Sequence, residues 1–292
     1  MTTELIDAFR DTLQVSMCEQ LRPSTEQSIQ DTEVYFEGFR HCRNTKGEEP
    51  PSWLAAIEIT AETTFAAAKR YAPLGKTAVL NFANPEVPGG GVEYGARAQE
   101  ECLCRCSNLY PSISSPAVFQ DYYRYNTQYR YYYTDRLLYT PNIIVFKDEQ
   151  SIPQFLPAEE WFRTDVITCA APMSIYMAQV DEKELKTVMK SRIRNIFEAA
   201  ADHHVQNLIL GAFGCGAFRN PPRLVADAFR EVILENGYDS LFPHIVFAIK
   251  KTGAVCPNLE AFRAAFAQMP DGPSRLRQLR RQRQLRKLLH QL

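Results

Sequence analysis

The chain has 292 residues, of which 45% are hydrophobic, and its formal net charge is −1. This length and apolar content are ample for a folded core, and the absence of an apolar run of about 18 residues argues against a transmembrane helix. The charge is uneven: residues 271–292 hold seven Arg or Lys and one Asp, so the first 270 residues carry a net charge of −7. A body of that sign is not expected to bind nucleic acids in general.

The N-terminal residues predict an amphipathic helix over 3–21, because Leu5, Phe9 and Leu13 recur at helical spacing. Its mixture of acids and apolar residues does not resemble a secretory signal. Residues 22–52 are polar and are expected to be irregular. We therefore predict an N-terminal accessory segment, 1–52, a catalytic body, 53–270, and a basic helical tail, 271–292.

Strands and helices alternate through the body. The expected strands are 55–60, 79–83, 143–146, 165–169, 208–210 and 245–249, and the expected helices are 65–71, 96–109, 181–203, 223–234 and 259–269. This alternation predicts an α/β fold with a mainly parallel sheet covered on both faces. Ligands of such sheets bind beyond the carboxyl ends of the strands.

A tyrosine-rich block lies between the helix 96–109 and the strand 143–146. It runs from Tyr122 to Tyr133, and Asn126-Thr127 separates its aromatic runs. Two interpretations stay open: a hairpin at the rim of the domain, or an aromatic surface that meets adenine or a carrier protein.

The first glycine loop follows the strand 79–83. It contains Gly89-Gly90-Gly91 and is followed, at the expected start of a helix, by Gln99-Glu100-Glu101. Bare amides can form an anion nest, and adjacent helical residues point about 100° apart. One carboxylate could therefore face a ligand while its neighbour orients it. The simpler alternative is a turn before a helix whose acids favour the helix dipole.

The second glycine loop, Gly211 to Phe218, follows the strand 208–210 directly. Its glycine spacing before a helix is typical of a phosphate cradle, although it lacks the Lys-Ser/Thr of a P-loop. Because both loops follow strands, both are expected at one sheet edge and in one pocket.

Together these motifs resemble the poly(ADP-ribose) glycohydrolase family. The run from Asn81 to Gly91, followed by Gln99-Glu100-Glu101, is similar to the family's catalytic loop, and the run from Gly214 to Pro221 is similar to its diphosphate loop. Order and separation match the microbial-type branch over about residues 55–268. The resemblance implies a macrodomain-like three-layer α/β/α sandwich with a mixed, mainly parallel sheet and an N-terminal accessory helix.

The resemblance also implies roles for individual residues. Glu101 would be the catalytic acid and then the base that activates water, Glu100 would hold a ribose hydroxyl, and Gln99 would support the loop. Among the residues expected to bind substrate, Asn84 and Phe218 would contact the distal ribose. The diphosphate would lie between Gly89, Gly90 and Gly91 on one side and Gly214, Cys215, Gly216 and Ala217 on the other.

The implied activity is hydrolysis of the ribose–ribose bond of poly(ADP-ribose), without a metal or cofactor. The alternatives are removal of single ADP-ribose units from proteins, and binding of ADP-ribose without cleavage. The substrate partners are thus ADP-ribose, its polymer or an ADP-ribosylated protein, and no membrane partner is expected. The tail is either a solvated or oligomerising helix, or a contact for a polyanion. Eight cysteines without a CxxC pair favour a cytoplasmic or nuclear location.

Overall fold

The computed structural model describes residues 2–39, 53–176, 181–251 and 253–289. Its seven strands form one sheet in the order β1-β4-β5-β3-β6-β7-β2. The strands are β1 (Glu33–Tyr35), β2 (Ala56–Thr60), β3 (Thr77–Phe82), β4 (Leu137–Val145), β5 (Phe162–Cys169), β6 (Asn207–Leu210) and β7 (His244–Ala248). The run from β5 to β2 is parallel, and β4 is antiparallel to both β5 and β1.

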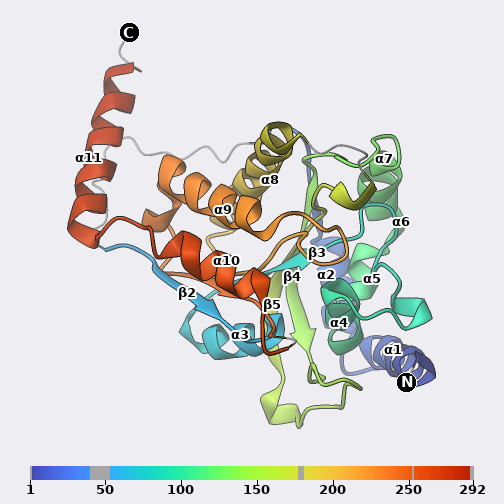
Figure 1. The fold of residues 1–292 in the computed structure, drawn as a ribbon. Helices are drawn as coiled ribbons and strands as arrows, with labels where there is room; N and C mark the ends of the chain where they lie inside the picture. The colour runs from blue at the N-terminus through green and yellow to red at the C-terminus, as the bar shows by residue number, and fades with distance from the viewer. Residues whose placement is uncertain (1, 40–52, 177–180, 252, 290–292) are drawn as a thin grey trace.

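Helices cover both faces of this sheet (Figure 1). The helices of the described residues are α1 (Thr2–Ser16), α2 (Arg22–Gln30), α3 (Thr64–Tyr71), α4 (Gln99–Cys106), α5 (Leu109–Ile113), α6 (Pro116–Val118), α7 (Arg124–Asn126), α8 (Glu182–Asp202), α9 (Pro222–Asn236), α10 (Pro257–Phe266) and α11 (Gly272–Leu289), of which α11 extends away from the sheet. Among the described residues, none of the helices is both long enough and apolar enough to cross a membrane.

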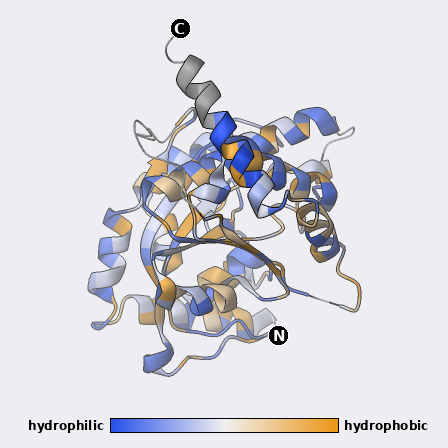
Figure 2. Cartoon of the chain, turned by 90° about the vertical axis from the view of Figure 1, so that its left-hand side faces the viewer, coloured by the Kyte–Doolittle hydropathy of each residue, from blue (hydrophilic) through white to orange (hydrophobic). Residues whose placement is uncertain are grey.

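Alternation along the strands decides which face each side chain covers. Leu80 and Ile167 belong to the core under α8, α9 and α10, whereas their neighbours Val79 and Val166 belong to the core under α3, α4 and α5. Figure 2 shows the resulting apolar interior between the two helical layers. The predicted three-layer α/β/α fold with a mixed, mainly parallel sheet is confirmed.

The N-terminal segment is more regular than its sequence indicates. Residues 22–52 were expected to be irregular, but α2 begins at Arg22, with Pro23 in its first turn, and β1 pairs with β4. A three-residue edge strand gains its stability from its partner, so its local sequence carries little signal. The remainder of that expectation, over 40–52, lies outside the described residues.

The tyrosine-rich block is helical at its start, so the expectation of a hairpin is wrong. Residues 116–126 form a short helical run made of α6, a single wider turn and α7. Tyr122 and Tyr123 are fully buried there, with their rings 4.9 Å apart edge to face. The strand preference of tyrosine reflects packing on a sheet, and here the rings pack under helices instead.

Candidate active site

The two glycine loops meet at one edge of the sheet. β3 and β6, the strands that precede them, are hydrogen-bonded neighbours that run parallel. Their loops enclose a cavity of about 380 Å³. From the first loop and α4 it is lined by Asn84, Gln99, Glu100 and Glu101, and from the second loop by Gly214, Gly216, Ala217 and Phe218.

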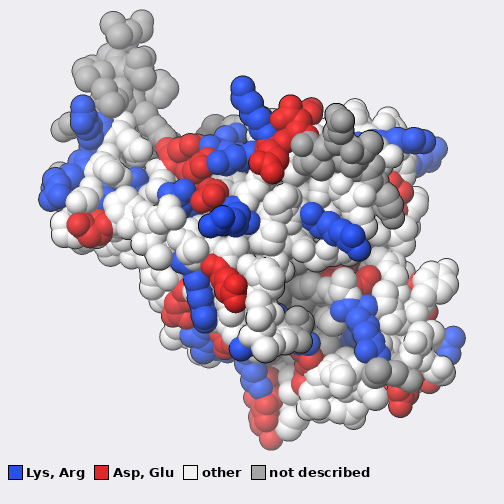
Figure 3. All heavy atoms as spheres, viewed as in Figure 1, with Lys and Arg blue, Asp and Glu red and all other residues white. Residues whose placement is uncertain are grey.

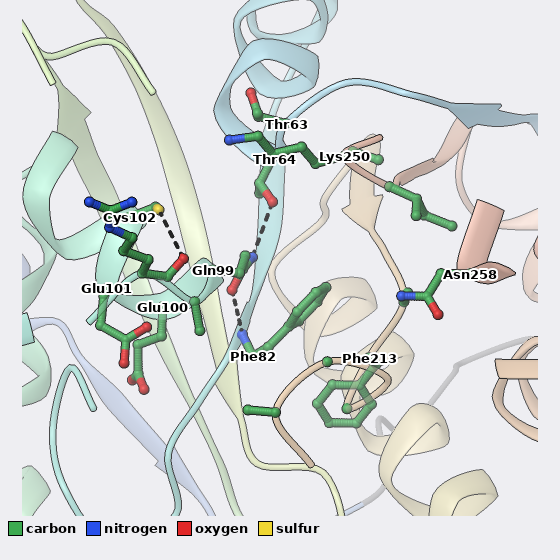
Figure 4. A pocket seen from close by; sticks show the side chains of 18 of the residues that line it. Thr63, Thr64, Phe82, Gln99, Glu100, Glu101, Cys102, Phe213, Lys250 and Asn258 are labelled. Carbon is green, nitrogen blue, oxygen red and sulfur yellow. Dashed lines mark hydrogen bonds between the residues drawn. The ribbon is translucent and has the colours of Figure 1, made fainter. Parts of the chain in front are cut away.

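Gln99 fixes the start of α4 to the end of β3. Its Oε1 accepts a hydrogen bond from the Phe82 N–H at 2.8 Å, and its Nε2 donates to the Leu80 carbonyl at 2.7 Å and to Thr64 Oγ1 at 3.1 Å (Figure 4). The amide therefore uses a donor and an acceptor at once. Because Gln99 opens α4, these bonds set the position of the two glutamates that follow.

Glu100 is almost fully buried, with 2% of its surface exposed. Its Oε2 accepts from the Asn84 N–H at 2.6 Å, and its Oε1 accepts from Asn81 Nδ2 at 3.3 Å. Burial raises the pKa of Glu100 to about 8, although these donors and the Gly89 amide act to lower it. Burial therefore favours the protonated form of Glu100 near neutral pH.

Glu101 is held by a single hydrogen bond. Its Oε1 accepts from the Gly91 N–H at 3.0 Å, whereas its Oε2 is buried without a hydrogen-bond partner among the described residues. The side chain lines the cavity and is 7% exposed. A buried oxygen with no partner is costly unless a ligand or water supplies one, so Glu101 is the carboxylate with capacity left for substrate.

Position 90, where the first loop contacts the two glutamates, requires a glycine. Its φ is +57°, and a Cβ at this position would stand 2.5 Å from Glu101 Oε1 and 3.3 Å from Glu100 Oε2. The three glycine amides were expected to face a diphosphate, but those of Gly90 and Gly91 donate hydrogen bonds to the protein itself. Gly90 donates to the Val87 carbonyl and Gly91 to Glu101. The first loop thus positions carboxylates, and its glycines do not line the cavity.

The second loop has free amides. The N–H groups of Gly216, Ala217 and Phe218 donate to no acceptor within the ranges that the structure describes. The buried Asn220 braces this loop, because its Nδ2 donates to the carbonyls of Pro172 at 2.8 Å and Gly214 at 3.1 Å. Three consecutive amides in a preformed loop match the hydrogen-bond acceptors of a diphosphate.

Cys215 turns away from this cradle. It is not among the residues that line the cavity, and its N–H already donates to the Ala212 carbonyl at 3.0 Å. Burial raises the pKa of its thiol to about 12. Neither its thiol nor its amide is therefore presented to a ligand in this structure.

The side chain of Asn84 is also engaged. Its Oδ1 accepts from the N–H groups of Glu86 at 2.9 Å and Val87 at 3.0 Å, which closes the turn after β3. Asn84 was expected to bond a distal ribose, and only its Nδ2 is left for such a contact. Phe218, by contrast, lines the cavity while its ring also packs against the core.

Several residues of the cavity wall were not predicted as site residues from the sequence. Phe82 and Phe213 stand in its middle, with ring centroids 6.0 Å apart, and Lys250 and Asn258 lie at the end away from Glu101 (Figure 4). Lys250 follows β7, and the rule that ligands bind beyond strand ends places ligand contacts in this region without naming the residue. Asn81 is a buried amide inside an apolar strand, which is itself a signal of a polar site.

Comparison with known proteins places this site in a family. The model of the catalytic domain of microbial-type PARG matches residues 2–148. No curated protein sequence matches the chain. Among solved structures, the chain is 36% identical to the poly(ADP-ribose) glycohydrolase of Deinococcus radiodurans in complex with ADP-ribose, with 84% of this chain and 97% of that chain covered and a TM-score of 0.72.

Two structures of the enzyme from Thermomonospora curvata are similar over even more of the chain. Its poly(ADP-ribose) glycohydrolase is 32% identical, with 90% of this chain and 100% of that chain covered and a TM-score of 0.80. The complex of that enzyme with the inhibitor ADP-HPD is 32% identical, with coverage of 89% and 98% and a TM-score of 0.77. The resemblance found in the glycine loops therefore extends over the whole body, and the chain belongs to the microbial-type poly(ADP-ribose) glycohydrolase family.

Proposed function

We propose that this chain hydrolyses the ribose–ribose O-glycosidic bond of poly(ADP-ribose) and releases ADP-ribose. The observation that carries this function is the unpartnered Oε2 of Glu101 in the wall of a cavity that also holds a free amide cradle. Family membership and similar structures that bind ADP-ribose and ADP-HPD support it.

The cavity suggests how the substrate lies. The diphosphate meets the amides of Gly216, Ala217 and Phe218, and the distal ribose lies between Phe218 and the glutamates. Adenine then reaches the end lined by Thr63, Ile249 and Lys250. This places the anomeric carbon of the distal ribose beside Glu101.

Bond cleavage requires that Glu101 first donates a proton and then accepts one. Glu101 donates its proton to the departing ribose oxygen as the glycosidic bond breaks and that oxygen takes the electron pair. Water then attacks the anomeric carbon and returns a proton to Glu101. Glu100 orients the distal ribose through a hydroxyl, and the bound diphosphate stabilises the positive charge that develops on the sugar.

Substitution of one carboxylate tests this function. Wild type should release ADP-ribose from the purified polymer, as followed by chromatography, and Glu101→Gln should lower the rate by about 10²–10⁴-fold. Affinity for ADP-ribose should be kept. Glu93→Gln is the matched control, because Glu93 is an exposed acid of the same loop that accepts from Tyr110.

Two other outcomes would favour the alternative functions. Release only from mono-ADP-ribosylated proteins would favour the protein hydrolase alternative. Tight ADP-ribose binding by wild type without release from either substrate would overturn the enzyme assignment and leave a binding module.

The basic tail supports capture of the polymer. Arginines gather on the described part of α11, which projects from the body (Figures 1 and 3). Arg277, Arg280 and Arg281 are exposed there. The variant Arg280→Gln/Arg281→Gln should weaken polymer binding and flatten its salt dependence, whereas Arg10→Gln at the other end of the chain should not. An unchanged salt dependence would show that the tail does not take part in substrate capture.

A reducing compartment, the cytoplasm or the nucleus, is proposed for this function from the sequence alone, because its eight cysteines form no CxxC pair.

A further inference from the structure

The first two tyrosines of the tyrosine-rich block pack against the helix that carries the glutamates. Tyr122 and Tyr123 are fully buried, and they belong to the same apolar cluster as Leu103 and Cys104 of α4. The function proposed above does not use them. This part of the block therefore supports α4 from inside the core and does not form a surface.

The hydroxyl groups of Tyr122 and Tyr123 have no hydrogen-bond partner in the part of the chain that the structure describes. A buried hydroxyl in this situation has lost its hydrogen bonds to water and has gained none in return, which destabilises the folded chain. Phenylalanine would fill the same space without that cost. Orphaned polar groups in a core therefore indicate either a buried water or a functional role.

The carboxyl group of Glu100 lies close to these hydroxyls. Burial raises the pKa of Tyr123 well above its ordinary value, and among the neighbouring groups Glu100 raises it most, ahead of Tyr122 and Cys104. Burial and Cys169 raise the pKa of Tyr122, and Glu100 adds to this effect. Of the two hydroxyls, that of Tyr123 is therefore the one on which Glu100 acts more strongly.

The sheet adds a third orphaned atom on the same side. Asn81 Oδ1 is buried without a hydrogen-bond partner among the described residues. The Nδ2 of this amide donates to Thr168 Oγ1 at 3.2 Å and to Glu100 Oε1 at 3.3 Å. Val79, two residues earlier on β3, belongs to the cluster that contains Tyr123, so alternation along the strand places Asn81 on that face of the sheet.

The two oxygens of Glu100 are held unequally. Oε2 accepts a short hydrogen bond from the Asn84 N–H at 2.6 Å, whereas Oε1 accepts the longer one from Asn81. Oε1 thus has capacity for a further hydrogen bond, as an acceptor when Glu100 is ionised or as a donor when it is protonated. A buried water typically makes about three hydrogen bonds to such groups.

We propose that Tyr123 is a positioning residue of Glu100. A buried water accepts a hydrogen bond from the Tyr123 hydroxyl, donates one to Asn81 Oδ1 and shares one with Glu100 Oε1, so that the carboxyl is held at both oxygens. The inference rests on the proposed function, in which Glu100 orients the distal ribose, and it adds the residue that fixes this orientation. Hydrogen bonds through ordered water are nearly as strong as direct ones.

Removal of one oxygen atom tests the effect on catalysis. Tyr123→Phe should lower kcat for ADP-ribose release about five- to tenfold, the contribution of one hydrogen bond. KM should change little, because the diphosphate cradle still binds the substrate while the ribose is less well aligned. Tyr238→Phe is the matched control: Tyr238 is also fully buried, but its hydroxyl donates to Glu198 on the other side of the sheet, so this variant should keep its kcat.

A double-mutant cycle tests whether the hydroxyl acts through Glu100. Urea denaturation gives the free energies of unfolding of wild type, Tyr123→Phe, Glu100→Ala and the double variant. Tyr123→Phe should destabilise wild type clearly more than it destabilises Glu100→Ala, because the contact is already lost in the second background. Tyr238→Phe should have the same effect in both backgrounds.

Three results would overturn the inference. A Tyr123→Phe variant that is more stable than wild type and keeps its kcat would show that the hydroxyl is an orphan without a role. An equal effect on stability with and without Glu100 would show that the hydroxyl does not contact this carboxyl. Coupling in stability with an unchanged kcat would leave a structural contact only.

The proposed function is tested separately. Failure of wild type to cleave the polymer would overturn that function, whereas the unfolding cycle requires no turnover and would still report on the contact between Tyr123 and Glu100.

Discussion

Glu101 Oε1 accepts a hydrogen bond from the Gly91 N–H at 3.0 Å, while its other carboxylate oxygen is buried without a partner. The glycine loop therefore holds one oxygen of the Glu101 side chain and leaves the other available to substrate. Because the donor is a backbone amide, its position is set by the conformation of the loop. The pairing explains why the glycines and glutamates, separated along the chain, act as one unit.

The first prediction concerns Gly90. Gly90→Ala places a Cβ 2.5 Å from Glu101 Oε1 at a φ of +57°, so the carboxylate must move. We expect ADP-ribose release to fall by about 10²-fold, the cost of misplacing a catalytic group by about 1 Å. Gly272→Ala is the control, since a Cβ there meets nothing within 4 Å. Equal activity of the two variants would contradict the steric argument.

The second prediction concerns Gln99. Gln99→Glu replaces the donor to the Leu80 carbonyl by an oxygen and sets two acceptors 2.7 Å apart. We expect a loss of about 1–3 kcal/mol in the free energy of unfolding, together with reduced turnover as α4 shifts. Urea denaturation and ADP-ribose release measure the two effects. Gln128→Glu, at an exposed position, is the control, and a stable, fully active Gln99→Glu would show that the clamp is dispensable.

The third prediction concerns pH and Glu100. Its pKa is about 8 in the folded chain, above the ordinary value of 4.5 in the unfolded chain, because the carboxyl is buried. Between these values the folded chain binds more protons than the unfolded chain, so this group's contribution to the free energy of unfolding falls as pH rises from about 4.5 to about 8.

Glu100→Gln removes this titration. The stability of wild type relative to Glu100→Gln should therefore decline across that pH range by the order of a few kcal/mol and level off above it. Urea denaturation of both proteins from pH 5 to 9 measures the difference. A difference that is constant with pH would mean that Glu100 is ionised throughout.

The fourth prediction concerns the root of the tail. Arg275 and Asp239 are 1% and 2% exposed and form a two-point ion pair, at 2.6 Å and 2.9 Å. Arg275→Ala leaves the Asp239 carboxylate buried without its cation, which should cost about 3–5 kcal/mol and lower the melting temperature. Arg277→Ala, at an exposed neighbour, should change it little. Similar melting temperatures of the two variants would show that α11 is not anchored by this pair.

The sequence by itself determined the layered fold and the identity of the glutamates. Short apolar strands alternate with amphipathic helices along the chain. Because each apolar face must be buried, this pattern favours a parallel sheet covered by helices. The end of α9 is also encoded locally, because Gly237 adopts the left-handed conformation there, with a φ of +72°.

Only the tertiary structure decided how each loop is used. The sequence shows that Gly89–Gly91 are glycines, but not that the Gly91 amide already holds the Glu101 side chain while the amides of Gly216–Phe218 stay free. Likewise, the aromatic content of Tyr122–Tyr133 favours a strand until helical packing buries Tyr122 and Tyr123. These outcomes depend on contacts between segments distant along the chain, and the free energy of such contacts exceeds local preference.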